Sequence, residues 1–318
     1  MNEIGGYFEL ELRKGEEYHK GAIRLNSGRN ALEYVLRAKG YKKVYLPSYC
    51  CEVMLEPINK LKLGYEFYPI NEQLEPIFDF NRIGADETFL YINYFGIKND
   101  IVQKLSKKCH NLLIDNSQAF FEKPLSGIDT FYSPRKFFGV PDGAYLFTDK
   151  ILPIKLSQDK SVVRFSHLIK RIDDGAEAGY PDFKANNEDI KDQPIKLMSS
   201  LTQALLCNID YDNVIQPRNQ NFRFLHEYLQ ESNEFKLPED NDFVPMVYPY
   251  LTPEGKSLKQ KLIQNKIFVP TYWPKSEKGG DQYFYEEYLI QNLLPIPIDQ
   301  RYTIREIKSV LELIDINV

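Results

Sequence analysis

The chain has 318 residues, of which 14% are aromatic, with a formal net charge of −5 and a pI of about 5.6. This composition predicts a well-filled globular core, and it gives no electrostatic reason to expect nucleic acid as a partner. No apolar run is long enough to cross a membrane, and the acidic N-terminal residues do not resemble a signal peptide.

The cysteines and histidines are dispersed along the chain. Cys50 and Cys51 are neighbours without the spacing of a zinc-binding pair, and Cys109 and Cys207 are isolated. We therefore expect neither a metal site nor a disulfide framework. A reduced, cytoplasmic protein is the expectation that follows.

Short apolar runs alternate with helical patterns in the N-terminal part of the chain. Two further apolar segments, 130–132 and 144–148, are close enough in sequence to pair through the turn between them. Such alternation predicts a largely parallel sheet with crossover helices. In chain order we predict a helix at 26–40, strands at 42–47, 65–70 and 87–96, a strand that runs into a loop at 111–120, and helices at 52–64 and 100–109.

The remainder begins with a polar region, 151–192, that has no clear pattern. Residues 199–231 are predicted to be mostly helical, with Pro217 as a bend or a break. Thr303 and Glu306 have the spacing of a capping box for a closing helix. The predicted C-terminal elements are a strand at 242–251, a helix at 254–266, a strand at 267–273 and a helix at 303–314.

These patterns suggest a division of the chain into four parts. We expect an N-terminal segment (1–20), a large α/β domain (21–165), a polar linker with a long helical region (166–235) and a small α+β domain (236–318).

Common nucleotide-binding and hydrolase motifs are absent. The sequence EGKS at 254–257 resembles the end of a phosphate loop, but Tyr250 stands where the loop requires its first glycine. No GxGxxG follows a predicted strand, and no GxSxG is present.

Three segments could carry chemistry, and each also has a simpler interpretation. Ser27 and Gly28 begin a predicted helix, which suits a phosphate group, although Ser27 could be an ordinary N-cap. Asp115 ends a buried strand, where ligands bind in open α/β sheets, although it could simply begin a turn.

Lys136 is the third candidate. Held among Phe131, Phe137 and Phe138, its amine would be partly desolvated, would lose its proton more readily and could act as a nucleophile. The alternative is a lysine whose stem lies on apolar surface while its ammonium group stays in water.

The order of the three segments is more informative than any one of them. A phosphate-type helix start, then a strand-end Asp, then a Lys 21 residues later is the layout of a pyridoxal-phosphate site. The sequence here resembles the DegT/DnrJ/StrS sugar aminotransferases. The similar segments are LNSGRNAL, VYLPSYCCEVML, INYFG, LIDNSQAF, SPRKFFGVPDGAYLF and the ending LLPIPIDQRYTIREIKSVLELI.

The resemblance implies a fold and a cofactor. The fold would be that of the fold type I aminotransferases, an α/β domain with a mostly parallel seven-stranded sheet and a smaller C-terminal α+β domain. The cofactor would be pyridoxal 5'-phosphate, bound as a Schiff base to Lys136, the catalytic residue, with Asp115 on the pyridine nitrogen. Gln118 would lie by the ring, while the phosphate would be held by Ser27, Gly28, Arg29 and Ser133.

The resemblance also implies a partner and a reaction. The active site would lie between the subunits of a homodimer. An amino group, from glutamate, would pass to a keto sugar nucleotide in polysaccharide or amino-sugar biosynthesis. Where many relatives place an aromatic ring over the cofactor, this chain has Tyr49, Cys50 and Cys51.

Several residues depart from the family pattern. Arg29 stands in place of a usual threonine, and Arg135 precedes the lysine, where its positive charge would favour a neutral amine. Two alternatives therefore stay open beside the aminotransferase: a pyridoxal-phosphate-dependent dehydratase or other lyase on a related sugar, and a catalytically altered homologue that only binds the cofactor. Retention of Lys136 disfavours the dehydratase, in which histidine replaces the lysine.

Overall fold

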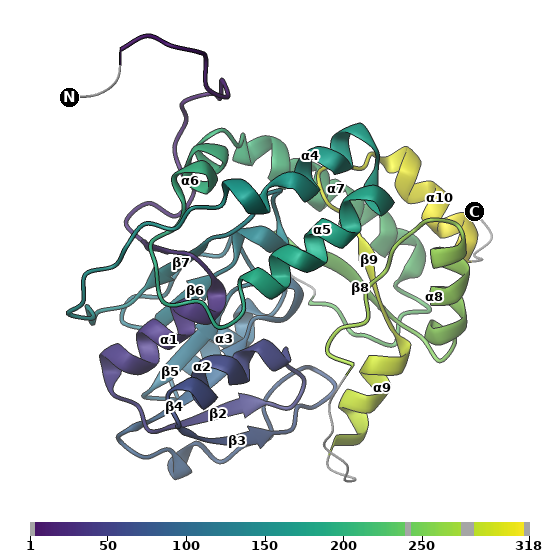
Figure 1. Cartoon of the computed structure of the whole chain (residues 1–318). Coiled ribbons are helices and arrows are strands. Elements are labelled where there is room, and N and C mark those ends of the chain that lie inside the picture. The colour runs from purple at the N-terminus through teal and green to yellow at the C-terminus, as the bar shows by residue number, and fades with distance from the viewer. Residues whose placement is uncertain (1–3, 239–242, 275–282, 315–318) are drawn as a thin grey trace.

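The computed structural model describes residues 4–238, 243–274 and 283–314 (Figure 1). Its main feature is a seven-stranded sheet with the order β1-β7-β6-β5-β4-β2-β3. Strands β2 to β6 run parallel, whereas β7 is antiparallel to both of its neighbours. The strands are β1 (Ile23–Leu25), β2 (Lys43–Pro47), β3 (Gly64–Tyr68), β4 (Glu87–Ile92), β5 (Leu112–Asp115), β6 (Asp129–Tyr132) and β7 (Ala144–Phe147).

The central strands are buried on both faces, as expected of a parallel sheet covered by helices. Every residue of β5 and β6 is buried, and so are the last five of β4. The predicted strands of this sheet are confirmed, and the segments at 130–132 and 144–148 pair as β6 and β7. The helices of this half are α1 (Gly28–Lys39), α2 (Leu55–Lys60) and α3 (Asn99–Ser106).

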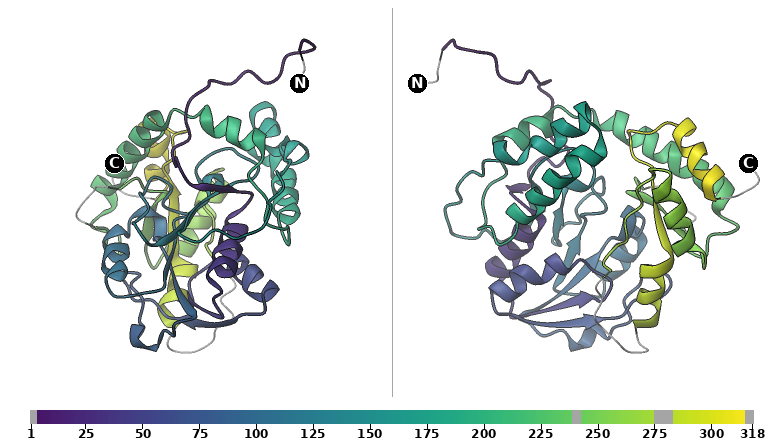
Figure 2. Two further views of the ribbon diagram at one scale, coloured as in Figure 1. Left: turned by 90° about the vertical axis from the view of Figure 1, so that its left-hand side faces the viewer. Right: turned by 45° about the vertical axis from the view of Figure 1, so that its right-hand side comes forward.

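A second, smaller unit follows along the chain. Figure 2 shows its two antiparallel strands and their helices to one side of the large sheet. No helix within the described ranges is long and apolar enough to cross a membrane. The remaining elements are α4 (Ser166–Asp173), α5 (Ala176–Asp189), α6 (Ser200–Cys207), α7 (Tyr211–Leu229), β8 (Val247–Leu251), α8 (Gly255–Gln264), α9 (Phe284–Asn292), β9 (Leu293–Pro297) and α10 (Ile304–Ile314).

Local capping signals determine where several helices begin and end. The hydroxyl of Ser27 accepts a hydrogen bond from the N–H of Asn30, and Gly40 adopts a left-handed φ of 71° after the last turn of α1. At α10, the Glu306 carboxylate accepts from the N–H of Thr303 at 2.8 Å. The predicted starts of both helices are therefore confirmed.

Two predictions in the second half of the chain are wrong, a break at Pro217 and a strand at 267–273. Pro217 lies inside α7 without ending it, because the buried side chains of Val214 and Arg218 hold the helix in place, and the break comes before Asp210 instead. The predicted strand at 267–273 is not a strand in the structure. Its place beside β8 is taken by β9, whose two prolines obscured the strand pattern.

The polar region at 151–192, which has no clear sequence pattern, contains the helical hairpin α4–α5. The predicted strand at 242–251 is confirmed as β8 from Val247, and its first residue lies outside the described residues.

Asp142 anchors the turn between β6 and β7. Its fully buried carboxylate accepts hydrogen bonds from the N–H and the hydroxyl of Ser199, at 2.9 and 2.7 Å, and from the hydroxyl of Thr202. The next residue, Gly143, has a φ of 116°, and a Cβ there would lie 3.1 Å from Thr202 and 3.2 Å from Met198 and from Pro134. The turn is thus fixed against the start of α6 and requires glycine.

Replacing Asp142 with Ala should lower the free energy of unfolding by about 3 kcal/mol, because the Ser199 N–H would be buried without an acceptor. Urea denaturation measures this loss. The control Asp100→Ala removes an exposed carboxylate paired with Lys104 and should change the same quantity by less than about 0.5 kcal/mol. Equal losses in the two variants would contradict the anchoring role of Asp142.

Candidate functional site

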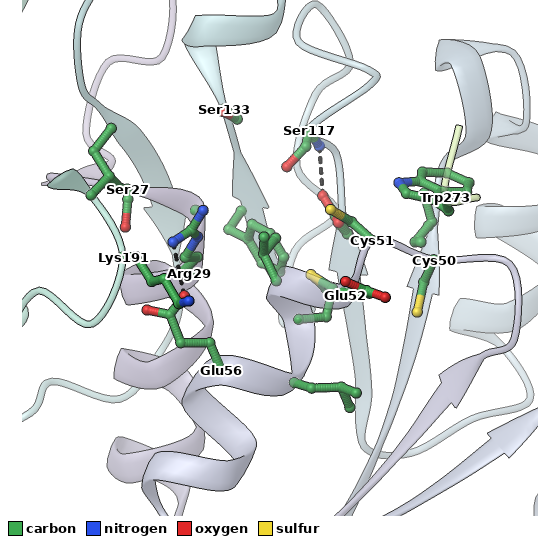
Figure 3. Close-up of a pocket in the computed structure, with 18 of the residues that line it drawn as sticks. Ser27, Arg29, Cys50, Cys51, Glu52, Glu56, Ser117, Ser133, Lys191 and Trp273 are labelled. Carbon is green, nitrogen blue, oxygen red and sulfur yellow. Dashed lines mark hydrogen bonds and ion pairs between the residues drawn. The ribbon is translucent and has the colours of Figure 1, made fainter. Parts of the chain in front are cut away.

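A cavity of about 1230 Å³ lies at the carboxyl ends of the parallel strands (Figure 3). The start of α1, the segments that follow β2, β5 and β6, and the end of α5 form its walls, together with Tyr272 and Trp273. The carboxyl edge is where open α/β sheets bind ligands, because loops from several strands meet there.

The cavity brings together nearly all of the predicted site residues. Tyr49 is the exception: it is not among the described residues that line the cavity. Its buried ring packs edge-on against Trp273 at 4.5 Å between centroids and stacks on Tyr94 at 5.9 Å. The predicted residues that line the cavity are Ser27, Gly28, Arg29, Cys50, Asp115, Gln118, Ser133 and Lys136.

The start of α1 has the features of an anion site. The first N–H groups of a helix have no partner within the helix, and the helix dipole is positive at that end. Ser27 caps the helix by accepting from Asn30 at 3.2 Å, so its hydroxyl proton is still available to a ligand. The N-cap and phosphate-binding interpretations of Ser27 are therefore compatible.

Asp115 ends β5 with its carboxylate buried at the cavity wall. Its Oδ1 accepts from the N–H of Ser117 at 2.7 Å. Burial raises the pKa of Asp115 to about 6, against the lowering effects of the hydrogen bonds from Ser117 and the charge of Lys136. A buried carboxylate of this kind favours a cationic ligand group beside it.

Gln118 lines the same wall and also supports the backbone behind it. Its Oε1 accepts from the N–H of Phe95 at 2.8 Å, where Phe95 has an unusual φ of 58°. Gly96 follows with a φ of 73°, and a Cβ there would lie 2.8 Å from the Gln118 carbonyl oxygen. Gln118 thus stabilises the tight turn that follows β4.

Lys136 lies in a 3₁₀ turn, Pro134–Lys136, with its exposed side chain at the cavity. The prediction that neighbouring phenylalanines desolvate it is wrong. Consecutive residues of a tight turn project in different directions, so Phe137 and Phe138 are buried against Phe120 instead. Phe131 is the only one of the three predicted phenylalanine neighbours that lines the cavity.

Arg218 and Gln300 hold the backbone directly after Lys136, and sequence reasoning missed both. The guanidinium of Arg218 lies 4.6 Å from the centroid of the Phe137 ring, and its Nε donates to Gln300 at 3.1 Å. Gln300 in turn donates to the Phe137 carbonyl at 3.0 Å. No local pattern could identify these residues, because their partners are far away in the sequence.

The end of α5 closes another wall through polar contacts. Arg29 forms an ion pair with Glu56 at 2.8 Å, and Glu56 accepts from the N–H of Asp192 at 2.7 Å. Arg135 donates to the side-chain oxygen of Asn187 at 2.8 Å. Sequence reasoning also missed Glu56 and Asn187, the partners of the two arginines, and Asp192, which binds Glu56. Within the described ranges, no cluster of three or more His, Cys, Asp or Glu residues could hold a metal ion.

Comparison with known proteins establishes the fold. No protein-family model matches the chain, and no curated protein matches its sequence. Solved structures do match. A DegT DnrJ EryC1 StrS aminotransferase from Brucella abortus is 13% identical over 92% of this chain and 84% of its own, with a TM-score of 0.61.

Two further structures agree. NtdA from Bacillus subtilis with bound cofactor PMP is 15% identical over 92% of this chain and 73% of its own, with a TM-score of 0.64. DesI in the presence of its TDP-sugar product is also 15% identical, over 92% and 79%, with a TM-score of 0.64. The chain therefore has the fold of these aminotransferases, as the sequence resemblance predicted.

The buried position of Asp115 predicts a dependence of stability on pH. Its pKa is raised in the folded state, so the folded state binds the proton more tightly than the unfolded state does. As the pH rises from about 4 to about 6 this proton is lost, and the ionised carboxylate then destabilises the fold. Asp115→Asn removes the titration. The unfolding free energy of the variant, minus that of the wild type, should rise by up to about 3 kcal/mol over this range and level off above it.

Urea denaturation of ligand-free protein at a series of pH values measures this difference. Asp86→Asn is the control, because Lys42 lowers the pKa of Asp86, so the corresponding difference should fall slightly with pH. A flat profile for Asp115→Asn would contradict a buried, titrating carboxyl group at this position.

Proposed function

We propose that the protein is a pyridoxal-phosphate-dependent aminotransferase that transfers an amino group, from glutamate, to a keto sugar nucleotide in polysaccharide or amino-sugar biosynthesis. The observation that carries this proposal is the convergence of the α1 start, Asp115 and Lys136 on one cavity. NtdA, of the same fold, binds PMP, and DesI, of the same fold, has a TDP-sugar product.

The residues of the cavity fit the cofactor. The first N–H groups of α1 and the hydroxyls of Ser27 and Ser133 would hold its phosphate. Asp115, a buried carboxylate with an elevated pKa, would keep a proton on the pyridine nitrogen. When bound, pyridoxal 5'-phosphate supplies an electron-withdrawing ring that stabilises negative charge on the substrate carbon.

The chain's own residues would carry out the proton transfers. Lys136 lines the cavity and lies close enough to Asp115 for its charge to lower the pKa of that carboxyl group. Its amine would anchor the cofactor and then move a proton at the substrate carbon. The cavity exceeds the roughly 300–1000 Å³ of common small-ligand pockets, so it could hold a large substrate beside the cofactor.

Replacing Lys136 with Ala tests the assignment of the amine. Purified wild-type protein with pyridoxal 5'-phosphate should show the visible absorbance of cofactor joined to a lysine, and it should release 2-oxoglutarate from glutamate in a single turnover. Lys136→Ala should abolish that absorbance and slow release by about 10²–10⁴-fold, because the positioned acid–base group is lost.

The control is Lys108→Ala, which removes an exposed lysine that does not line the cavity and should leave both signals intact. Cofactor bound to the wild type without any 2-oxoglutarate would favour the catalytically altered homologue. Absence of cofactor binding by the wild type would refute the proposal.

We further propose that the protein is a cytoplasmic homodimer, with residues 21–165 and 236–318 as its large and small domains. All four cysteines are free, which suits a reducing compartment. Large exposed apolar side chains concentrate on the α4–α5 hairpin and the segment before it, and such clusters favour an interface. They are Ile151, Ile154, Val162, Val163, Ile169, Ile172, Tyr180 and Phe183.

Light scattering during gel filtration tests the dimer. The wild type should have twice the chain mass of 37.3 kDa, and the combined change Val163→Glu and Ile172→Glu should shift it to the monomer, because buried charge opposes association. Ile77→Glu, which alters an exposed isoleucine elsewhere, should leave the dimer unchanged. A dimer that persists in the double variant would exclude this surface.

A further inference from the structure

Arg135 differs in its partner from Arg29 and Arg164, the two arginines whose charges act on it. Arg29 forms an ion pair with Glu56 at 2.8 Å, and Arg164 forms one with Asp159 at 2.6 Å. Arg135 instead donates to the uncharged side-chain oxygen of Asn187. No ion pair joins it to a carboxylate in the part of the chain that the structure describes.

The Arg135 guanidinium also has an unused donor. Its Nε is buried and has no hydrogen-bond partner among the described residues. Asp142 attracts it from a distance, but that carboxylate already accepts three hydrogen bonds from Ser199 and Thr202. Burial, assisted by the like charge of Arg29, lowers the pKa of Arg135 to about 10. A buried cation in this situation is unfavourable until an anion comes to it.

The position of Arg135 indicates which anion would come. It lies between Ser133 and Lys136 in sequence, lines the same cavity as Ser27 and Gly28, and feels the charge of Arg29 in the first turn of α1. A phosphate at the start of α1 would therefore have Arg135 near it. Guanidinium groups pair well with phosphate oxygens.

We propose that Arg135 is the counter-charge of the cofactor's phosphate group, an inference that rests on the proposed function. The diphosphate of a sugar nucleotide has related chemistry, so the experiment must separate the two sources. Arg135 would determine cofactor affinity, while Lys136 beside it would carry the chemistry.

Binding measurements on cofactor-free protein test this role. Trp273 is the chain's one tryptophan and lines the cavity, so its fluorescence reports occupancy without any assay of activity. The probes are pyridoxal 5'-phosphate, pyridoxal, which lacks the phosphate, and TDP-glucose. The variants are Arg135→Met, Arg135→Lys and the control Lys108→Met, which removes an exposed cation that does not line the cavity.

Arg135→Met should weaken binding of pyridoxal 5'-phosphate by about 10- to 100-fold, because a charged hydrogen bond is lost. Affinity for pyridoxal should stay within about twofold of the wild type, since pyridoxal has no phosphate to lose. Arg135→Lys should restore part of the loss, because it keeps the charge without the planar fork. Lys108→Met should change neither affinity.

Thermal unfolding supplies a second measurement. Without phosphate, Arg135→Met should melt at or above the wild-type temperature, because the unpaired buried cation is gone. Added inorganic phosphate should raise the melting temperature of the wild type more than that of the variant. A variant that melts well below the wild type in both conditions would show that Arg135 serves the fold and would overturn the proposal.

Other outcomes separate this inference from the proposed function. Wild-type protein that does not bind pyridoxal 5'-phosphate would refute both. Equal binding of pyridoxal 5'-phosphate by wild type and Arg135→Met would refute the role of Arg135 alone. Loss of TDP-glucose binding with unchanged cofactor binding would assign Arg135 to the substrate, and equal losses for pyridoxal and its phosphate would also overturn the proposal.

Discussion

Parallel pairing of β5 with β6 places Asp115 opposite Phe131, and the candidate site depends on this register. Both strands end at the same edge of the sheet, so the chain after Asp115 and the chain after Tyr132 enter one cavity. Because β7 returns antiparallel beside β6, the segment that holds Lys136 must turn back at that edge. A slip of one residue in either pairing would face the opposite set of side chains towards the cavity.

The lysine turn is held from two directions by buried polar groups. On one side, Asp142 fastens the end of the turn to Ser199 at the start of α6. On the other, Arg218 and Gln300 fix Phe137, the residue directly after Lys136. A fully bonded polar network specifies one geometry better than apolar packing does. The C-terminal region thus shapes the site through the backbone of Phe137, although Lys136 itself lies in the connection between β6 and β7 of the large sheet.

The sequence could reveal the parts of this arrangement that depend on neighbouring residues. Ser27 before a helix and Asp115 after an apolar strand are local signals, and the structure has a helix start and a strand end at these positions. The predicted environment of Lys136 is wrong, because sequence proximity to phenylalanines does not indicate where their rings point. Contacts such as Arg135 with Asn187 have no local signal, since they depend on how α5 packs against the cavity.

The electrostatics of the cavity favour a ligand with charges of both signs. Ser117, whose N–H binds the Asp115 carboxylate, also lies beside the start of α1, because its hydroxyl oxygen is 3.8 Å from where a Cβ on Gly28 would be. Burial disfavours the charged form of Asp115. It also disfavours the charged form of Arg135, and the like charge of Arg29 adds to this effect. A neutral ligand would leave both penalties in place, and a simple anion would relieve only one. A flat ring with a protonated nitrogen at one end and a phosphate at the other would relieve both, since each buried charge would then gain its counter-charge.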